Sequence, residues 1–145
     1  NAYGQIATVT LDAGVSITIS DGTENGGGGA FGTQNPADVI FSGFAYPEAV
    51  VTFLKNDTVI GTALADEDGT FTKLVKVDEG LVTFGIWGKD TRGLNSVTTY
   101  IPLSVSSNQT INIANIFLSP TITADRFNLQ RGGTLRIFGS AFRGY

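Results

Sequence analysis

Three clusters of turn-forming residues between Phe41 and Ser96 constrain this chain more than any other feature. They read Ser-Gly-Phe-Ala-Tyr-Pro at 42–47, Ala-Asp-Glu-Asp-Gly-Thr-Phe at 65–71 and Lys-Asp-Thr-Arg-Gly-Leu-Asn-Ser at 89–96. Short stretches of alternating apolar and polar residues lie between them. Short strands separated by Gly, Pro and Asp turns at fairly even spacing are typical of an antiparallel β-sandwich. The sequence therefore predicts an all-β fold and says little about chemistry.

The alternating stretches predict about seven strands, the number found in an immunoglobulin-like sandwich. In one stretch Val82, Phe84 and Ile86 alternate with residues suited to the opposite face of a sheet. No stretch has the 3.6-residue periodicity of a helix, so almost no helix is expected. The expected strands are 39–45, 49–55, 59–65, 71–77, 81–89, 97–103 and 110–113, with an N-terminal hairpin formed by 6–11 and 15–20.

The composition excludes several kinds of chemistry. The chain has no Cys and no His, which rules out disulfides, thiolate catalysis and a Ser-His-Asp triad. Charged residues make up 15% of the chain and hydrophobic residues 41%, so Thr, Ser, Asn and Gly must supply much of the polar surface. This pattern fits secreted β-proteins, and we expect an extracellular or cell-surface protein that is not an enzyme.

The charges are unevenly distributed. The net charge is −4; residues 1–119 hold twelve acidic and five basic residues (−7), and residues 120–145 hold one acidic and four basic residues (+3). An acidic body argues against nucleic acid as a partner. No stretch approaches the roughly 20 apolar residues of a membrane span. The expected partners are therefore neighbouring modules, copies of the chain itself, or a glycan.

Two pairs of similar segments suggest a tandem repeat of about 95 residues. Residues 15–21 resemble 109–115, and 38–44 resemble 135–141. The predicted organisation is the end of a preceding module at 1–21, a Gly-rich tether at 22–36, a complete sandwich at 37–119, and at 120–145 the first strands of a following module or a donor segment. That last segment would expose an apolar face to be covered by another copy, by the module itself or by further chain: Phe127, Leu129, Leu135, Ile137 and Phe142.

The residues at 42–52, 65–71 and 90–96 resemble the pattern of bacterial immunoglobulin-like repeats, and are similar to the carboxypeptidase-regulatory type of sandwich. The segment Ile-Phe-Leu-Ser-Pro-Thr-Ile at 116–122 looks like a junction between consecutive repeats. The resemblance covers about residues 37–145. It implies a module of a large secreted or surface-anchored bacterial protein. The matching residues are turn and core positions, so the resemblance carries over no catalytic residue.

Asp66, Asp68 and Thr70 place several oxygen atoms in one tight turn. Calcium takes six to eight oxygen ligands, usually from more than one loop. The alternative is a hairpin turn in which the Asp side chains accept hydrogen bonds from the backbone, and this interpretation is favoured. No other cofactor is expected.

Trp87, Tyr46 and Tyr100 could form a platform on which a sugar stacks. Trp87 is out of phase with the apolar residues of its strand, which favours a place on the opposite, partly exposed face. The alternative is packing within the sheet or against a module, and it is favoured because single surface aromatics are common.

These observations predict two functions. The first is an extracellular structural module of a bacterial surface protein, adhesin, stalk or filament that acts by β-strand packing between modules or subunits. The second is a carbohydrate-binding module of a secreted multidomain protein. An exposed Trp87 beside Tyr46 or Tyr100 would favour the second.

Overall fold

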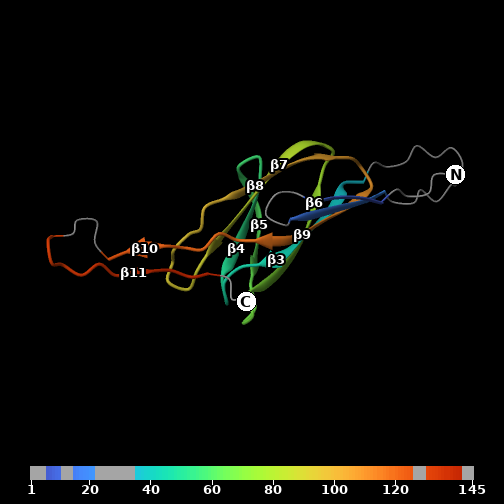
Figure 1. Cartoon of the computed structure of the whole chain (residues 1–145). Helices are drawn as coiled ribbons and strands as arrows, with labels where there is room; N and C mark the ends of the chain where they lie inside the picture. The colour runs from blue at the N-terminus through green and yellow to red at the C-terminus, as the bar shows by residue number, and fades with distance from the viewer. Residues whose placement is uncertain (1–5, 11–14, 22–34, 126–129, 142–145) are drawn as a thin grey trace, which may run out of the picture.

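The fold is all-β, as the sequence predicted. A computed structural model describes residues 6–10, 15–21, 35–125 and 130–141, and these residues form two sheets and a small separate hairpin (Figure 1). The described residues contain no helix, so none of them belongs to a helix long and apolar enough to cross a membrane.

Two sheets pack face to face as a sandwich. The first has the order β1-β2-β9-β3-β6 and is built from Ile6–Thr10 (β1), Ser16–Asp21 (β2), Gln109–Phe117 (β9), Ala37–Phe44 (β3) and Thr70–Val77 (β6). The second has the order β5-β4-β7-β8 and is built from Thr58–Leu64 (β5), Val50–Lys55 (β4), Gly80–Lys89 (β7) and Thr99–Val105 (β8). Thr123–Ala124 (β10) and Ile137–Phe138 (β11) pair with each other and extend away from the sandwich (Figure 1).

The core lies between the two sheets, where alternate residues of each strand point inward. Phe41 of β3 contacts Phe53 of β4 and Phe84 of β7, with ring centroids 5.0 and 5.2 Å apart. The predicted alternation in β7 is confirmed, because Val82, Phe84 and Ile86 are all buried. The aromatic contacts join strands of both sheets, so they hold the two layers together.

The pairing of β3 with β9 departs from the antiparallel pattern of the other ladders. These strands run parallel, from Asp38 opposite Thr110 to Phe44 opposite Phe117, with a register shift between Phe41 and Gly43. The first and last strands of the 37–119 sandwich therefore lie side by side. The sequence pattern could not show this, because alternation gives the face of a strand and not the direction of its neighbour.

Most strand boundaries differ from the prediction by one or two residues, and the largest difference is in β9. β9 continues to Phe117, well beyond the predicted end at Ile113. Asn115 has a φ of 57°, and this irregularity lets Ile113 and Ile116 both be buried although they are three residues apart. The strand predicted to begin at Val97 begins at Thr99, and Val97 is exposed.

The N-terminal hairpin extends the first sheet. β2 pairs antiparallel with β9, from Ser16 opposite Ala114 to Asp21 opposite Gln109, and β1 pairs with the far side of β2. Val15 and Ile17 are buried in the same core as the sandwich residues. Segments that the sequence marked as similar, 15–21 and 109–115, are thus hydrogen-bonded neighbours.

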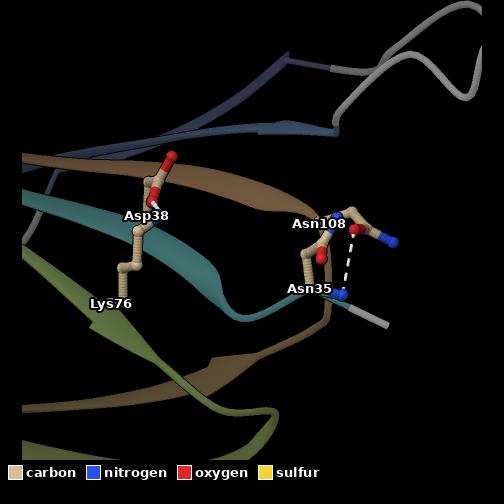
Figure 2. A network of polar contacts seen from close by, with 4 residues as sticks. All are labelled: Asn35, Asp38, Lys76 and Asn108. Carbon is tan, nitrogen blue, oxygen red and sulfur yellow. Dashed lines mark hydrogen bonds and ion pairs between the residues drawn. The ribbon is translucent and has the colours of Figure 1, made fainter. Parts of the chain in front are cut away.

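A polar clamp fixes the chain just before β3. Asn35 and Asn108 face each other in Figure 2, where the Asn35 N–H donates to Oδ1 of Asn108 at 3.3 Å. The Asn108 N–H donates in return to the Asn35 carbonyl at 2.9 Å. Nearby, Lys76 of β6 forms an exposed ion pair with Asp38 of β3 at 2.9 Å (Figure 2). The clamp places residue 35 beside the turn that leads into β9.

Candidate functional site: a buried carboxylate joint

Two turns of the sandwich have the same internal hydrogen bonds. One begins at Asp66 and the other at Asp90, and each has the pattern Asp-x-x-Gly followed by one further residue. In both, Oδ1 of the aspartate accepts the N–H groups two and four residues later, at 2.9 to 3.0 Å. Gly69 and Gly93 have φ values of 85° and 87°, a conformation that favours glycine in this position. The two local sequences therefore fold into one turn geometry.

The second carboxylate oxygen distinguishes the two turns. In the exposed turn, Oδ2 of Asp66 accepts the hydroxyl of Thr70, the residue four positions later. Leu94 occupies the equivalent position of the other turn and has no hydroxyl to offer. Oδ2 of Asp90 must find its partners elsewhere in the chain.

Those partners come from the segment that follows the sandwich. The Thr121 hydroxyl donates to Oδ2 of Asp90 at 2.7 Å, and the Ser140 hydroxyl donates to the same oxygen at 3.0 Å. Asp90 is 5% exposed and Thr121 is 3% exposed, so the contact excludes most water. We call Asp90, Thr121 and Ser140 the Asp90 joint.

The backbone at the base of the β10–β11 hairpin completes the joint. The Thr121 N–H donates to the Ser140 carbonyl at 2.8 Å, and the Ser140 N–H donates to the Thr121 hydroxyl at 2.8 Å. A Cβ atom on Gly139 would lie 1.8 Å from the Thr121 carbonyl oxygen and clash with it, so this position requires glycine. Both strands of the hairpin are thus held at one point, directly over the buried carboxylate.

Two further contacts tie this segment to the sandwich. The guanidinium of Arg92, in the Asp90 turn, lies 5.4 Å from the centre of the Phe138 ring, within the range of a cation–π interaction. The buried Tyr46 hydroxyl donates to the Ser119 carbonyl at 2.6 Å. No buried side-chain nitrogen or oxygen among the described residues lacks a hydrogen-bond partner.

The environment of the joint shifts the pKa of Asp90 and that of the nearby Tyr46. Burial by itself would raise the pKa of Asp90, but hydrogen bonds from Thr121, the Leu94 N–H, Ser140 and the Arg92 N–H favour the carboxylate and hold the pKa below its ordinary value. The pKa of Tyr46 is raised, mainly by burial; the nearby charge of Asp90 adds to the rise and a hydrogen bond with Ser96 opposes it. Asp90 is therefore a charged anchor at neutral pH.

Of the predicted calcium site, the Asp66 carboxylate and the Thr70 hydroxyl form hydrogen bonds within their own turn. Both oxygens of Asp66 accept hydrogen bonds, from Thr70 and from the Asp68 N–H, as the alternative interpretation expected. The Thr70 hydroxyl is the largest of the factors that lower the pKa of Asp66. Within the described part of the chain, no three Asp, Glu, His or Cys side chains are grouped so that they could hold a metal ion.

The three aromatic residues of the predicted sugar platform do not share one surface. Tyr46 is 1% exposed and belongs to the core. Trp87 is half-buried and Tyr100 is 57% exposed. Because Tyr100 pairs with Gly85, two residues before Trp87, these two side chains are diagonal neighbours on the outer face of the second sheet.

The predicted assembly face is described only in part. Leu135 and Ile137 are exposed, at 43% and 62%, and Phe138 and Ile122 of the same hairpin are exposed as well. Phe127, Leu129 and Phe142 lie outside the described residues. The hairpin is held to the sandwich through its polar base, while these described apolar side chains remain accessible.

The sequence interpretation did not single out Asp90, Thr121 or Ser140 as a site. The available signal was the Asp-x-x-Gly pattern, present at 66–69 and again at 90–93. The pattern predicts the turn in both places. The difference between Thr70 and Leu94 marks the second turn as the one with an unused carboxylate oxygen.

Comparison of the chain with models of protein families, with curated proteins and with solved structures finds no match.

Proposed function

We propose that this chain is a structural module of an extracellular bacterial surface protein, such as a stalk, adhesin or filament. In this role the Asp90 joint fixes the orientation of the segment after residue 119 relative to the sandwich. The observation that carries the proposal is the buried carboxylate whose second oxygen accepts two hydroxyl groups from beyond residue 119. A free linker would need no such contact. The joint gives the chain a defined direction where it leaves the sandwich.

The physical character of the joint supports this role. A buried charge contributes little net stability compared with an apolar contact of the same size, but losing one of its partners is costly. It therefore specifies one arrangement strongly. Apolar packing alone would tolerate small rotations of the hairpin, whereas two hydroxyls aimed at one oxygen do not.

The composition supports placement outside the cell. Charged residues make up only 15% of the chain, and Thr, Ser, Asn and Gly provide much of the polar surface. The resemblance of 42–52, 65–71 and 90–96 to bacterial immunoglobulin-like repeats points the same way.

The test compares Asp90→Ala with Asp66→Ala, which removes the same side chain from the matching turn. Amide hydrogen exchange is measured at 121–125 and 136–140, and the radius of gyration by small-angle scattering. We expect Asp90→Ala to abolish protection at these amides and to lower the stability of the docked hairpin by about 3 kcal/mol, because several buried donors lose their acceptor. Asp66→Ala should leave them protected.

A second variant keeps the result clear if Asp90→Ala unfolds the sandwich. Thr121→Val with Ser140→Ala removes the two hydroxyl donors and leaves the Asp90 turn its own N–H bonds. Retained protection of the hairpin in this double variant would contradict the proposal. Loss of protection with an intact sandwich would support it.

The outer face that carries Trp87 and Tyr100 supports a second candidate, carbohydrate binding. A glycan screen with the intact chain and with Tyr100→Ala tests it. Binding that is lost in Tyr100→Ala would favour this function. Absence of binding by the intact chain would remove it.

A further inference from the structure

We infer that the edge of β9 is an acceptor for β2 of a second copy of this chain, so that two copies can exchange their N-terminal hairpins. The inference rests on the proposed structural function and names a partner for the module: another copy, docked by strand addition. It involves β2 and the edge of β9 that pairs with β2, whereas Asp90, Thr121 and Ser140 of the Asp90 joint lie in neither strand. The two can therefore fail separately.

The acceptor site is a complete ladder with apolar positions of defined spacing. Opposite β9, Ile17 pairs with Ile113 and Ile19 with Ile111, while Thr18 pairs with Asn112 on the other face. Ile17 is 4% exposed, and Ile19 is packed against the core. A slip of one residue would turn both isoleucines to the outer face. The edge of β9 thus selects a strand with the alternation of β2 in one register.

The connection between β2 and β3 is much longer than the gap that it bridges. Asp21 lies opposite Gln109, and Asn35 is bound through two hydrogen bonds to the adjacent Asn108 (Figure 2). The two ends are separated by about two strand spacings, roughly 10 Å. Residues 22–34 could span on the order of 40 Å when extended. The covalent chain therefore permits β2 to reach the β9 edge of a second molecule.

Exchange would conserve the contacts of the hairpin. Each copy carries the same β2 and the same β9 edge, so every backbone hydrogen bond and each buried isoleucine of the closed form has an equivalent in the exchanged form. The connection holds a chain's own hairpin near β9 at an effective concentration of about millimolar. Exchange should therefore increase when the chain folds at about 1 mM protein.

Cross-chain disulfides test the inference directly, because the chain has no cysteine of its own. Ser20 lies opposite Thr110 in the ladder, so their Cβ atoms should be about 5 Å apart. Full chains carrying Ser20→Cys are mixed with full chains carrying Thr110→Cys, unfolded, refolded together at high concentration and oxidised. Mass spectrometry then measures the disulfide-linked heterodimer.

The matched control pairs Ser20→Cys with Asn112→Cys. Asn112 is on the same strand and face as Thr110, but it lies opposite Thr18. The displacement of about 7 Å along the strand prevents a disulfide in the native register. We expect roughly tenfold more heterodimer from the matched pair than from the displaced pair, with a yield that rises with protein concentration during folding.

Three outcomes would overturn the inference. One is equal heterodimer yield from the matched and displaced pairs. Another is a dominant Asn112→Cys homodimer, which would mean that two β9 edges pair with each other, as the similarity of 15–21 to 109–115 also permits. The third is failure of the single chain with Ser20→Cys and Thr110→Cys to close an internal disulfide, because the register itself would then be wrong. The Asp90 joint would be unaffected by all three.

Discussion

The turn that begins at Asp66 and the turn that begins at Asp90 share their backbone hydrogen bonds but differ in the residue at the fifth position. Thr70 gives the first turn a hydroxyl of its own, and the turn is complete within five residues. Leu94 has no hydroxyl, so Oδ2 of Asp90 has no donor at the fifth position of its own turn. Thr121 and Ser140, 31 and 50 residues away in sequence, donate their hydroxyls to it. One side chain thus separates a closed surface turn from an open one that binds another segment.

The segment around Tyr46 is hydrogen-bonded to the Asp66 turn and, through the Tyr46 hydroxyl, to the chain near the Asp90 turn. Ala45 and Glu48 donate backbone hydrogen bonds to Gly69 and Asp66 of the first turn. The Tyr46 hydroxyl reaches Ser119, close to the second. Because the same segment lies beside both turns, the effects of substitutions in the two turns can be compared directly.

Among substitutions outside the Asp90 joint itself, the largest effect should come from Gly139→Ala, which disturbs the hairpin base that donates to Asp90 and leaves both turns unchanged. The new Cβ would meet the Thr121 carbonyl oxygen at 1.8 Å, so the hairpin base must move. We expect its docking to weaken by about 2 kcal/mol, measured as increased amide exchange at 121–125. Unchanged exchange there would show that the hairpin base is not held over Asp90.

A smaller effect is expected from Tyr46→Phe, which removes the link on the Asp90 side and keeps the backbone contacts with the Asp66 turn. Loss of the hydrogen bond to the Ser119 carbonyl should lower the free energy of unfolding by about 1 kcal/mol, measured by denaturant titration. Tyr100→Phe is the control, because that side chain is exposed. Equal effects of the two substitutions would argue against a stabilising Tyr46 hydroxyl.

Acid should affect both turns in the same direction but with different consequences. The pKa values of Asp90 and Asp66 lie below the ordinary carboxyl value, about 4. Each carboxylate therefore contributes stability above that value, and the contribution is lost as pH falls through the lowered pKa. Only protonation of Asp90 should release the hairpin.

Amide exchange of the hairpin as a function of pH measures this difference. Asp66→Asn should leave the pH dependence of hairpin exchange unchanged, and Asp90→Asn should remove it. A hairpin whose protection in the unaltered chain does not decrease on acidification would contradict a charged anchor at Asp90.

The smallest effect, about 0.5 kcal/mol, is expected from Leu94→Thr. A hydroxyl at position 94 would compete with Thr121 and Ser140 for Oδ2 of Asp90, as Thr70 does for Asp66. Exchange at the Ser140 amide should increase slightly. Leu94→Val is the matched control, because it shortens the side chain without adding a donor. Equal exchange in the two variants would mean that the fifth residue does not distinguish the turns.

The sequence predicted the parts of the fold that depend on local pattern. Alternation gave the strands of the sandwich and their buried faces, as at Val82, Phe84 and Ile86. Asn56 and Asp57 lie between the expected strands 49–55 and 59–65, and both have the positive φ values, 47° and 65°, that Asn and Asp tolerate in a tight turn. These features depend on residues close together in the chain, so the sequence pattern contains the information directly.

The long-range pairings could not be predicted in the same way. The similarity of 15–21 to 109–115 indicated repetition, but it did not show that the two segments would pair with each other. The Asp90 joint depends on Thr121 and Ser140, whose polar side chains are typical of any loop. Such contacts depend on how the sheets pack in three dimensions. They cannot be deduced from a single sequence whose fold is not yet known.

The parallel ladder of β3 and β9 has a mechanical consequence. The chain enters this ladder at Ala37 and leaves it at Phe117, and because the strands are parallel these two points lie at opposite ends. A pull along the chain between them would slide β3 against β9 and load the hydrogen bonds together, in shear. Antiparallel neighbours pulled from the same end would instead open one bond at a time. A module of a stalk or filament that bears tension would resist extension best with its first and last strands arranged in this way.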